Sequence, residues 1–259
     1  MSAAPPPALA PRRAGLLRGT WVVLRRELGA YFDSSIAYAY LIAALVLLTT
    51  LYMNEFFLTG RLDMTPLFET LVPLSVFLLP AVTMRLWAED RKARTFELYV
   101  TLPLRAGQLV AGKYLAALAL YGLFLAGTLP VVAMLEALGD PDLGLIASGY
   151  LGALLQGALL LAIGSLLSAL TADQIVAFVA GVAVGFGVVF SGDPRVVAVL
   201  DVSAPELGLG SWLAGTLSSL PRHEALVGGL VELSSVTWFL GLTAACLWVE
   251  ALVVDRLRS

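Results

Sequence analysis

The most strongly charged stretch of the chain runs from Arg85 to Lys113. Its first part reads Arg85-Leu-Trp-Ala-Glu-Asp-Arg-Lys-Ala-Arg-Thr-Phe-Glu-Leu-Tyr-Val-Thr-Leu-Pro103, with acids and bases interleaved. It lies between two apolar runs that are long enough to cross a bilayer. Such side chains offer ion pairs and hydrogen bonds to a water-soluble surface on one side of the membrane. We therefore interpret this stretch as a contact surface for a cytoplasmic protein.

Residues suited to catalysis or metal binding are few. The chain has one histidine, His223, and one cysteine, Cys246, so a metal site lacks ligands. An intramembrane serine protease needs a serine and a histidine that meet inside the bilayer. Ser165 and Ser168 are available, but His223 is flanked by Pro, Arg and Glu and is expected in an exposed loop.

The chain also has no Gly-x-x-x-x-Gly-Lys-Ser/Thr loop with which to bind nucleotide phosphates. We therefore expect no enzyme activity, cofactor, metal or nucleic-acid binding in this chain. If the soluble partner is an ATPase, its nucleotide site lies on that partner.

Composition places the chain among polytopic membrane proteins. Hydrophobic residues make up 59% and charged residues 14%, with a mean hydropathy of +0.88. A helix needs about 20 apolar residues to cross a bilayer. Six runs qualify or nearly qualify, namely Ile36–Met53, Pro66–Met84, Tyr114–Leu135, Leu143–Leu170, Ile175–Ser191 and Leu233–Val249. The sequence predicts an all-α protein with six transmembrane helices.

Lysine and arginine predict the orientation. With the N-terminus inside, all basic residues except Arg61, Arg195 and Arg222 lie on the inner side, and the outer loops are acidic. Both termini are therefore expected in the cytoplasm. The proline-rich residues 1–15 are predicted to form a disordered tail rather than a signal peptide.

Residues 16–32 are predicted to form an amphipathic elbow helix at the membrane interface. Apolar residues recur at helical spacing: Leu17, Trp21, Leu24, Leu28 and Tyr31. Arginines lie off this stripe: Arg18, Arg25 and Arg26. Such a helix lies with its apolar face in the acyl boundary and its arginines near anionic headgroups. The alternative is a soluble helix packed on a partner.

The charged stretch shows helical order of its own. Its apolar stripe contains Phe96, Tyr99, Val100 and Pro103, and its polar stripe contains Arg94, Glu97 and Thr101. Pro103 disfavours helix at Leu102 and ends the segment. The pattern favours a short amphipathic helix across the inner membrane face, which could carry motion from a partner into two spans. A topology determinant with a solvated surface is equally compatible with these residues.

A family resemblance favours the first interpretation. The segment Pro80-Ala-Val-Thr-Met-Arg-Leu-Trp-Ala-Glu-Asp-Arg-Lys-Ala-Arg-Thr-Phe-Glu-Leu resembles the signature region of type-2 ABC exporter permeases, and Pro103 and Lys113 occupy family positions. More narrowly, the chain is similar to the gliding-motility-type (Gld) permease subunit. Supporting pieces are Phe32 with Ser34-Ser-Ile-Ala-Tyr38, Leu170-Thr-Ala-Asp-Gln-Ile-Val-Ala-Phe178 and Gly229-Leu-Val-Glu-Leu233. Arg94 departs from the pattern, because the family has glycine there and arginine resists positive φ.

The resemblance covers nearly the whole chain beyond about residue 20 and implies a type-2 ABC exporter transmembrane domain over residues 16–259. Its parts would be the elbow helix (16–32), a coupling region (85–105) and short outer-face helices (193–232). The coupling residues would be Glu89, Asp90, Arg91, Lys92, Arg94, Thr95, Glu97, Thr101 and Pro103.

The resemblance also implies partners and a location. A separate ATPase subunit would hold ATP and Mg in the cytoplasm, and the bundle would sit among the lipids of a bacterial inner membrane. A second bundle would be an identical chain or a Gld-type companion with a large external domain. The complex would export or extract an unidentified cargo. The alternative is a membrane scaffold that couples an ATPase to an external partner without moving cargo.

Inside the membrane, the spans are expected to hold no buried charge. Glu69, Glu136 and Glu250 lie near span ends, where they are expected to reach the interface as solvated anchors. This argues against a proton-coupled carrier and favours an apolar or amphipathic cargo that moves along a protomer interface.

Two features suggest helix contacts. Gln156, in the middle of a span, is expected to hydrogen bond across helices. Gly181 and Gly185 form a small-xxx-small face for packing within the chain or against a second protomer.

Residues 193–232 contain no full span. One amphipathic helix is predicted from Leu209, Trp212, Leu213, Leu217 and Leu220, within a re-entrant or interfacial hairpin on the outer face.

Overall fold

The computed structural model describes residues 15–93, 104–203 and 209–258, and these residues form helices and no strands. Five helical segments are long and apolar enough to cross a membrane: Ala37–Thr59, Thr65–Lys92, Ala106–Leu138, Leu143–Leu170 and Leu233–Arg258. The prediction of an all-α polytopic membrane protein is confirmed.

The remaining predicted span is a shorter helix, α9 (Gln174–Phe190), of 17 residues. Its length is about 25 Å at about 1.5 Å per residue, near the lower limit for crossing the hydrocarbon. The side chain of Asp173 fixes its start by accepting hydrogen bonds from the backbone N–H groups of Ile175 and Val176.

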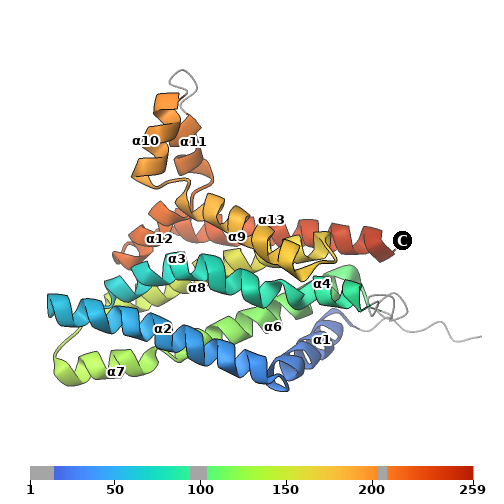
Figure 1. Ribbon diagram of the computed structural model, residues 1–259, viewed down its shortest axis with the longest axis horizontal. Helices are drawn as coiled ribbons and strands as arrows, with labels where there is room; N and C mark the ends of the chain where they lie inside the picture. Colours follow the sequence, from blue (N-terminus) through green and yellow to red (C-terminus); the bar gives the residue numbers. More distant parts are fainter. Residues whose placement is uncertain (1–14, 94–103, 204–208, 259) are drawn as a thin grey trace, which may run out of the picture.

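The long helices lie side by side along one axis (Figure 1). We name the two ends of the bundle along this axis the basic end and the acidic end, after the basic residues expected on the inner side and the acidic loops expected on the outer side. The N-terminal helix α1 (Leu16–Phe32), the short helix α4 (Arg85–Lys92) and the C-terminus of α13 (Leu233–Arg258) lie at the basic end. At the acidic end, α2 (Ser35–Thr59) ends where Gly60 adopts a left-handed conformation with φ of 64°.

The second span bends without ending. Helix α3 (Thr65–Thr83) contains Pro73 and Pro80 and leads through a single turn residue, Met84, into α4. The charged residues Arg85–Lys92 therefore extend a spanning helix rather than begin a separate loop. The amphipathic helix predicted around Phe96, with Arg94, Thr95, Glu97, Thr101 and Pro103, lies outside the described residues.

The third span is interrupted. Helix α6 (Ala106–Ala126) ends before Gly127 and Thr128, and α7 (Leu129–Leu138) follows. Pro130 has no N–H to donate to the carbonyl of Ala126, and its ring would clash there, which favours a break at this point. The span predicted from Tyr114 to Leu135 lies within the apolar segment Ala106–Leu138, which contains this break. The hydroxyl of Thr128 instead donates to the carbonyl of Leu125 at 2.7 Å.

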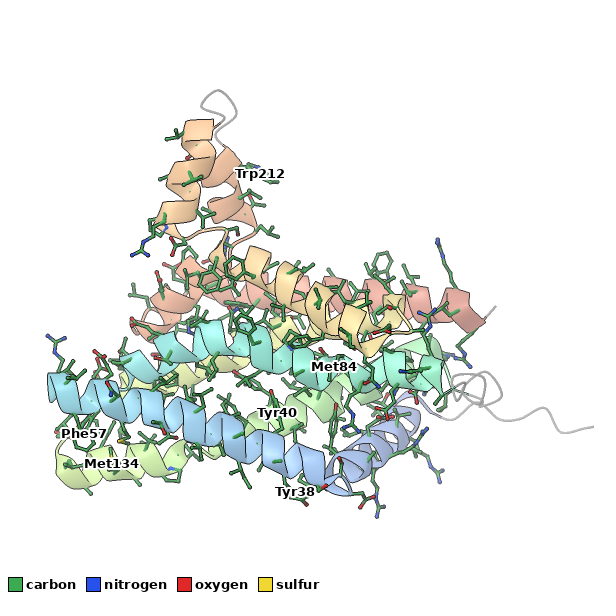
Figure 2. All side chains as sticks on the ribbon, in the orientation of Figure 1. Tyr38, Tyr40, Phe57, Met84, Met134 and Trp212 are labelled. Atoms are coloured by element: carbon green, nitrogen blue, oxygen red, sulfur yellow. The ribbon has the colours of Figure 1, made fainter. Side chains whose placement is uncertain are left out.

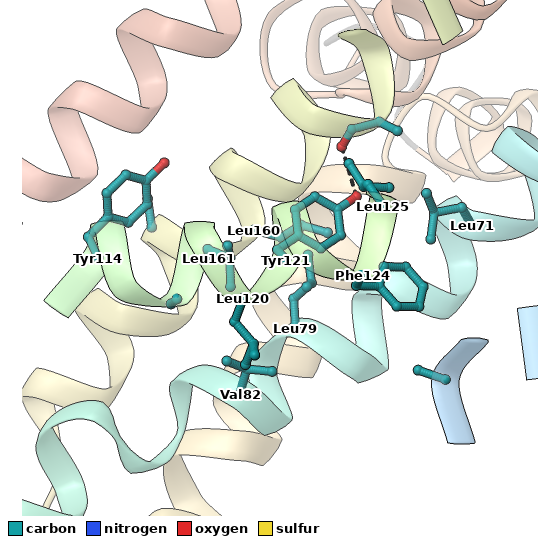
Figure 3. Packing of buried hydrophobic residues seen from close by; sticks show 14 of the residues in the cluster. Leu71, Leu79, Val82, Tyr114, Leu120, Tyr121, Phe124, Leu125, Leu160 and Leu161 are labelled. Atoms are coloured by element: carbon teal, nitrogen blue, oxygen red, sulfur yellow. Dashed lines mark hydrogen bonds between the residues drawn. The ribbon is translucent and has the colours of Figure 1, made fainter. Parts of the chain in front are cut away.

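Helix α8 (Leu143–Leu170) is the central element and contacts α3, α4, α6, α9 and α13. Glycines allow these close approaches: a Cβ at Gly157 would collide with the ring of Tyr121, and one at Gly164 with Thr83. The Tyr121 hydroxyl donates to the carbonyl of Ala153 at 2.9 Å, within a core of leucines and aromatic rings (Figure 3).

Gly181 and Gly185 pack α9 against the same chain. A Cβ at Gly181 would lie 2.9 Å from Pro80 of α3, and one at Gly185 would lie 3.3 Å from Leu160 of α8.

The N-terminal helix has the predicted bounds and packs along α6. The contact is tight, since a Cβ at Gly112 would lie 2.6 Å from the Cβ of Val23. Leu17 and Trp21 remain 88% and 62% exposed, so the N-terminal part of the predicted apolar stripe faces away from the bundle. Arg18, Arg25 and Arg26 lie on the same helix, and Leu24 and Leu28 are half-buried.

Three short helices lie at the acidic end: α10 (Pro194–Ser203), α11 (Leu209–Thr216) and α12 (Leu220–Val227). Helices α10 and α11 form a hairpin that projects across the direction of the long helices (Figure 1). The single helix predicted from Leu209 to Leu220 is wrong, because Pro221 starts a new helix, and prolines favour this first turn.

Candidate functional site

A group of buried polar side chains joins α4 to the rest of the bundle at the basic end. We name it the α4 cluster, and its members are Glu27, Trp87, Asp90, Lys113, Ser165, Ser168 and Glu250. Sequence analysis placed Asp90 in the coupling region and Lys113 at the start of a span, but it did not connect them with the other members.

The Lys113 ammonium on α6 is enclosed by the cluster, with a side chain 2% exposed. It lies 2.8 Å from an Asp90 carboxylate oxygen on α4 and 3.1 Å from one of Glu27 on α1. It also donates to the Leu86 carbonyl at 2.7 Å and lies 5.1 Å from the centre of the Trp87 ring. One lysine therefore links α1, α4 and α6.

The Glu250 carboxyl on α13 is fully buried. One of its oxygens accepts hydrogen bonds from the indole N–H of Trp87 at 2.6 Å and from the Ser165 hydroxyl at 2.7 Å. Its other oxygen has no hydrogen-bond partner among the residues that the structure describes. This contact joins α4, α8 and α13 inside the bundle.

Ser168 on α8 provides hydrogen-bond partners for backbone groups at the turn between α3 and α4. Its hydroxyl oxygen accepts from the backbone N–H groups of Trp87 and Ala88, at 3.1 and 3.2 Å, and it donates to the Met84 carbonyl at 3.0 Å. Arg91 donates to the carbonyl of Ala169 at 2.9 Å, at the last turn of α8, where carbonyls lack helical partners. The start of α4 is thus bonded to the end of α8.

The opposite face of α4 is open. Glu89 and Lys92 are exposed, and Glu89 lies 3.4 Å from Arg85 in an ion pair. Of the predicted coupling residues that are described, Glu89 and Lys92 therefore face solvent, whereas Asp90 and Arg91 turn toward the bundle.

Two expectations about charge are wrong. Glu250 is not a solvated anchor, because it is enclosed by Trp87 and Ser165. The spans do hold buried ionisable groups, Lys113 and Glu250, so the argument against a proton-coupled carrier loses its premise. An acidic residue in an apolar helix usually marks a functional contact, and this was the available signal. Glu69 and Glu136 are exposed.

His223 is buried, and the prediction of an exposed loop is wrong. It lies on α12 with 1% exposure, and its ring packs against Gly152 of α8. The carbonyls of Gly152 and Phe68 face the ring, but burial dominates and lowers the pKa of His223 below its ordinary value. Neither ring nitrogen has a well-formed hydrogen bond to a described residue.

The serines considered for a protease are committed to other contacts. Ser165 and Ser168 bond to Glu250 and to the start of α4. Ser165 lies about 20 Å along α8 from Gly152, beside which His223 packs. These residues therefore do not form a serine–histidine pair.

Gln156 is 2% exposed in the middle of α8, and its amide makes no hydrogen bond to any residue in the described ranges. The predicted hydrogen bond across helices is therefore wrong for this part of the chain.

Within the described residues, no group of three or more His, Cys, Asp or Glu side chains could hold a metal ion. Neither a protein-family model nor a curated protein matches the sequence.

Proposed function

We propose that this chain is the permease subunit of an ATP-driven transport complex in a bacterial inner membrane. In this proposal, the coupling region of residues 85–105, which includes α4, receives motion from a separate cytoplasmic ATPase. The observation that carries the proposal is the α4 cluster, which bonds one short charged helix to α1, α6, α8 and α13.

The two faces of α4 suit this role. Glu89 and Lys92 are open to a soluble surface, while Trp87 and Asp90 are held by buried partners. A force on the open face would be carried by the buried contacts into several spans, because packed elements move as rigid bodies. A merely solvated loop would not need an indole bonded to a buried carboxyl of the last helix.

The sequence resemblance supplies the rest of the proposal. Both termini lie in the cytoplasm, the ATPase binds ATP and Mg, and a second permease bundle completes the transport unit. That bundle is either an identical chain or a Gld-type companion with an external domain. The proposed cargo is apolar or amphipathic.

Charge reversal on the open face tests the proposal. Glu89→Arg and Lys92→Glu are expected to lower ATPase co-purification at least tenfold, with membrane insertion unchanged. Arg61→Glu is the matched control, since Arg61 is exposed at the other end of the bundle. Wild-type ATPase binding and turnover in both α4 variants would remove α4 from the mechanism.

One observation favours the scaffold function as a second candidate. The cavity between α2, α3 and α6, beside Tyr40 and Tyr121, holds only about 10 Å³, which is room for about one water. The space between these three helices leaves no room for cargo, which suits a subunit that transmits force without moving cargo. Vesicles that contain the complete complex separate the two functions, because the scaffold predicts ATP turnover without cargo movement.

A further inference from the structure

Two hollows adjoin at the basic end of the bundle. The first has a volume of about 280 Å³ and is lined by charged side chains, namely Arg26, Glu27, Arg85, Glu89, Asp90 and Lys113. The second has a volume of about 450 Å³, and its wall is mainly apolar, including Ala37, Tyr40, Val82, Met84 and Leu120. Tyr31, Arg85 and Glu89 line both hollows. Both volumes are close to or within the range of small-molecule sites, about 300–1,000 Å³.

The apolar hollow runs into the membrane-spanning part of the bundle. Tyr40 lies between α2 and α3, and Met84 marks the join of α3 and α4 (Figure 2). The Tyr40 hydroxyl donates to the Leu78 carbonyl at 2.5 Å, so the tyrosine presents a largely apolar ring to the hollow. Leu17 and Trp21 of α1 are exposed, and the later turns of the same helix line the charged hollow through Arg26 and Glu27. Amphipathic helices of this kind lie at the level of lipid headgroups.

We propose that the two hollows form one binding site for a zwitterionic phospholipid from the leaflet at the basic end. The headgroup occupies the charged hollow and an acyl chain follows the apolar one. Three basic and three acidic side chains line the charged hollow, so it matches a headgroup that carries both a phosphate and an ammonium.

The shared residues define how the headgroup binds. Arg85 binds the phosphate, since a guanidinium matches phosphate geometry, and the ring of Tyr31 supports it from 5.4 Å. Glu89, paired with Arg85 and 53% exposed in its side chain, receives the ammonium. A headgroup with only negative charge would meet the exposed Glu89 without a cation of its own to compensate that carboxylate.

Native mass spectrometry of the full chain in detergent tests this site. The probes are phosphatidylethanolamine and phosphatidylglycerol with identical acyl chains, added separately. The wild-type chain is expected to bind one phosphatidylethanolamine at least tenfold more tightly than one phosphatidylglycerol. Equal binding of the two lipids, or binding of neither, would overturn the proposal.

Two variants assign the contacts, and Arg61→Gln at the acidic end is the control. Arg85→Gln is expected to weaken the binding of both lipids at least fivefold. Glu89→Gln is expected to shift the binding preference toward phosphatidylglycerol. Glu89 is exposed, so its variant folds even if Arg85→Gln does not. A lipid preference that stays at the wild-type value in Glu89→Gln also contradicts the proposal. Glu89 also belongs to the face proposed for the ATPase, so lipid binding is measured on the chain without the ATPase, where its failure would leave the proposed function standing.

Discussion

Replacing Lys113 with methionine removes the ammonium that two carboxylates share and keeps most of the apolar stem. The side chains of Lys113, Glu27 and Asp90 are 2%, 14% and 16% exposed, so the two acids remain in a poorly solvated place. Breaking a buried ion pair in this way costs about 3–5 kcal/mol of stability. For a chain of this size, about 1 kcal/mol shifts Tm by about 2–4 °C, so we expect Lys113→Met to lower Tm by about 6–20 °C.

Thermal unfolding of the detergent-solubilised chain measures this shift. Lys92→Met is the matched control, because Lys92 is exposed on α4 and its loss should change the free energy of unfolding by less than about 0.5 kcal/mol. A Tm for Lys113→Met within about 2 °C of the Lys92→Met value would refute the reasoning that Lys113 is a buried and necessary charge.

The ion pairs of Lys113 with Glu27 and Asp90 also predict that removing the two acids restores stability to Lys113→Met. Adding Glu27→Gln and Asp90→Asn to Lys113→Met removes the uncompensated charges, so at least half of the decrease in Tm should be recovered. No recovery in the triple variant would mean that Lys113 acts through packing rather than through its ion pairs.

Two further predictions concern the acidic end and the core. Burial lowers the pKa of His223, so its stabilising contribution is full above about pH 6.5 and falls as the pH drops below that value. From pH 8 to pH 5, Tm should fall more in the wild type than in His223→Gln, and parallel curves would contradict this. Gly157→Ala should cost about 1–3 kcal/mol, because its Cβ collides with Tyr121, whereas Gly122→Ala meets open space and should be neutral or stabilising. Equal unfolding temperatures for the two glycine variants would show that this helix contact adapts freely.

The membrane helices were largely predictable because length and apolarity decide them. The N-terminal helix matched its prediction over residues 16–32, since its stripe recurs at helical spacing. The break between α6 and α7 was not predicted, although Pro130 lacks the N–H that a continuous helix would use there. Hydropathy alone does not reveal such a break, because an apolar run looks continuous whether or not each backbone N–H is present. Pro221 marks the start of α12, but the end of α11 at Thr216 lies before it and has no proline to signal it.

The α4 cluster could not be assembled from the sequence. The Trp87–Glu250 hydrogen bond joins residues far apart in the chain, and no local pattern relates them. Glu250 and Lys113 lie near span ends, where flexible side chains usually reach water. Only the packing of α13 and α6 against α8 shows that the Glu250 carboxyl and the Lys113 ammonium point into the bundle.

His223 illustrates the same limit in the opposite direction. Its neighbours Pro221, Arg222 and Glu224 suggested a polar loop, but one turn of α12 is enough to point a single side chain into the bundle. Charge and polarity of neighbours indicate the surface on average and do not fix the direction of one residue.

In the proposed function, the open face of α4 lies in the cytoplasm and contacts the ATPase. A single cysteine at Lys92→Cys, in a Cys246→Ser background that removes the only native cysteine, can be labelled with a membrane-impermeant maleimide. Residue 92 should remain unlabelled in intact cells, become labelled in inside-out vesicles, and be protected when the ATPase is bound. Labelling of residue 92 from outside intact cells would contradict it.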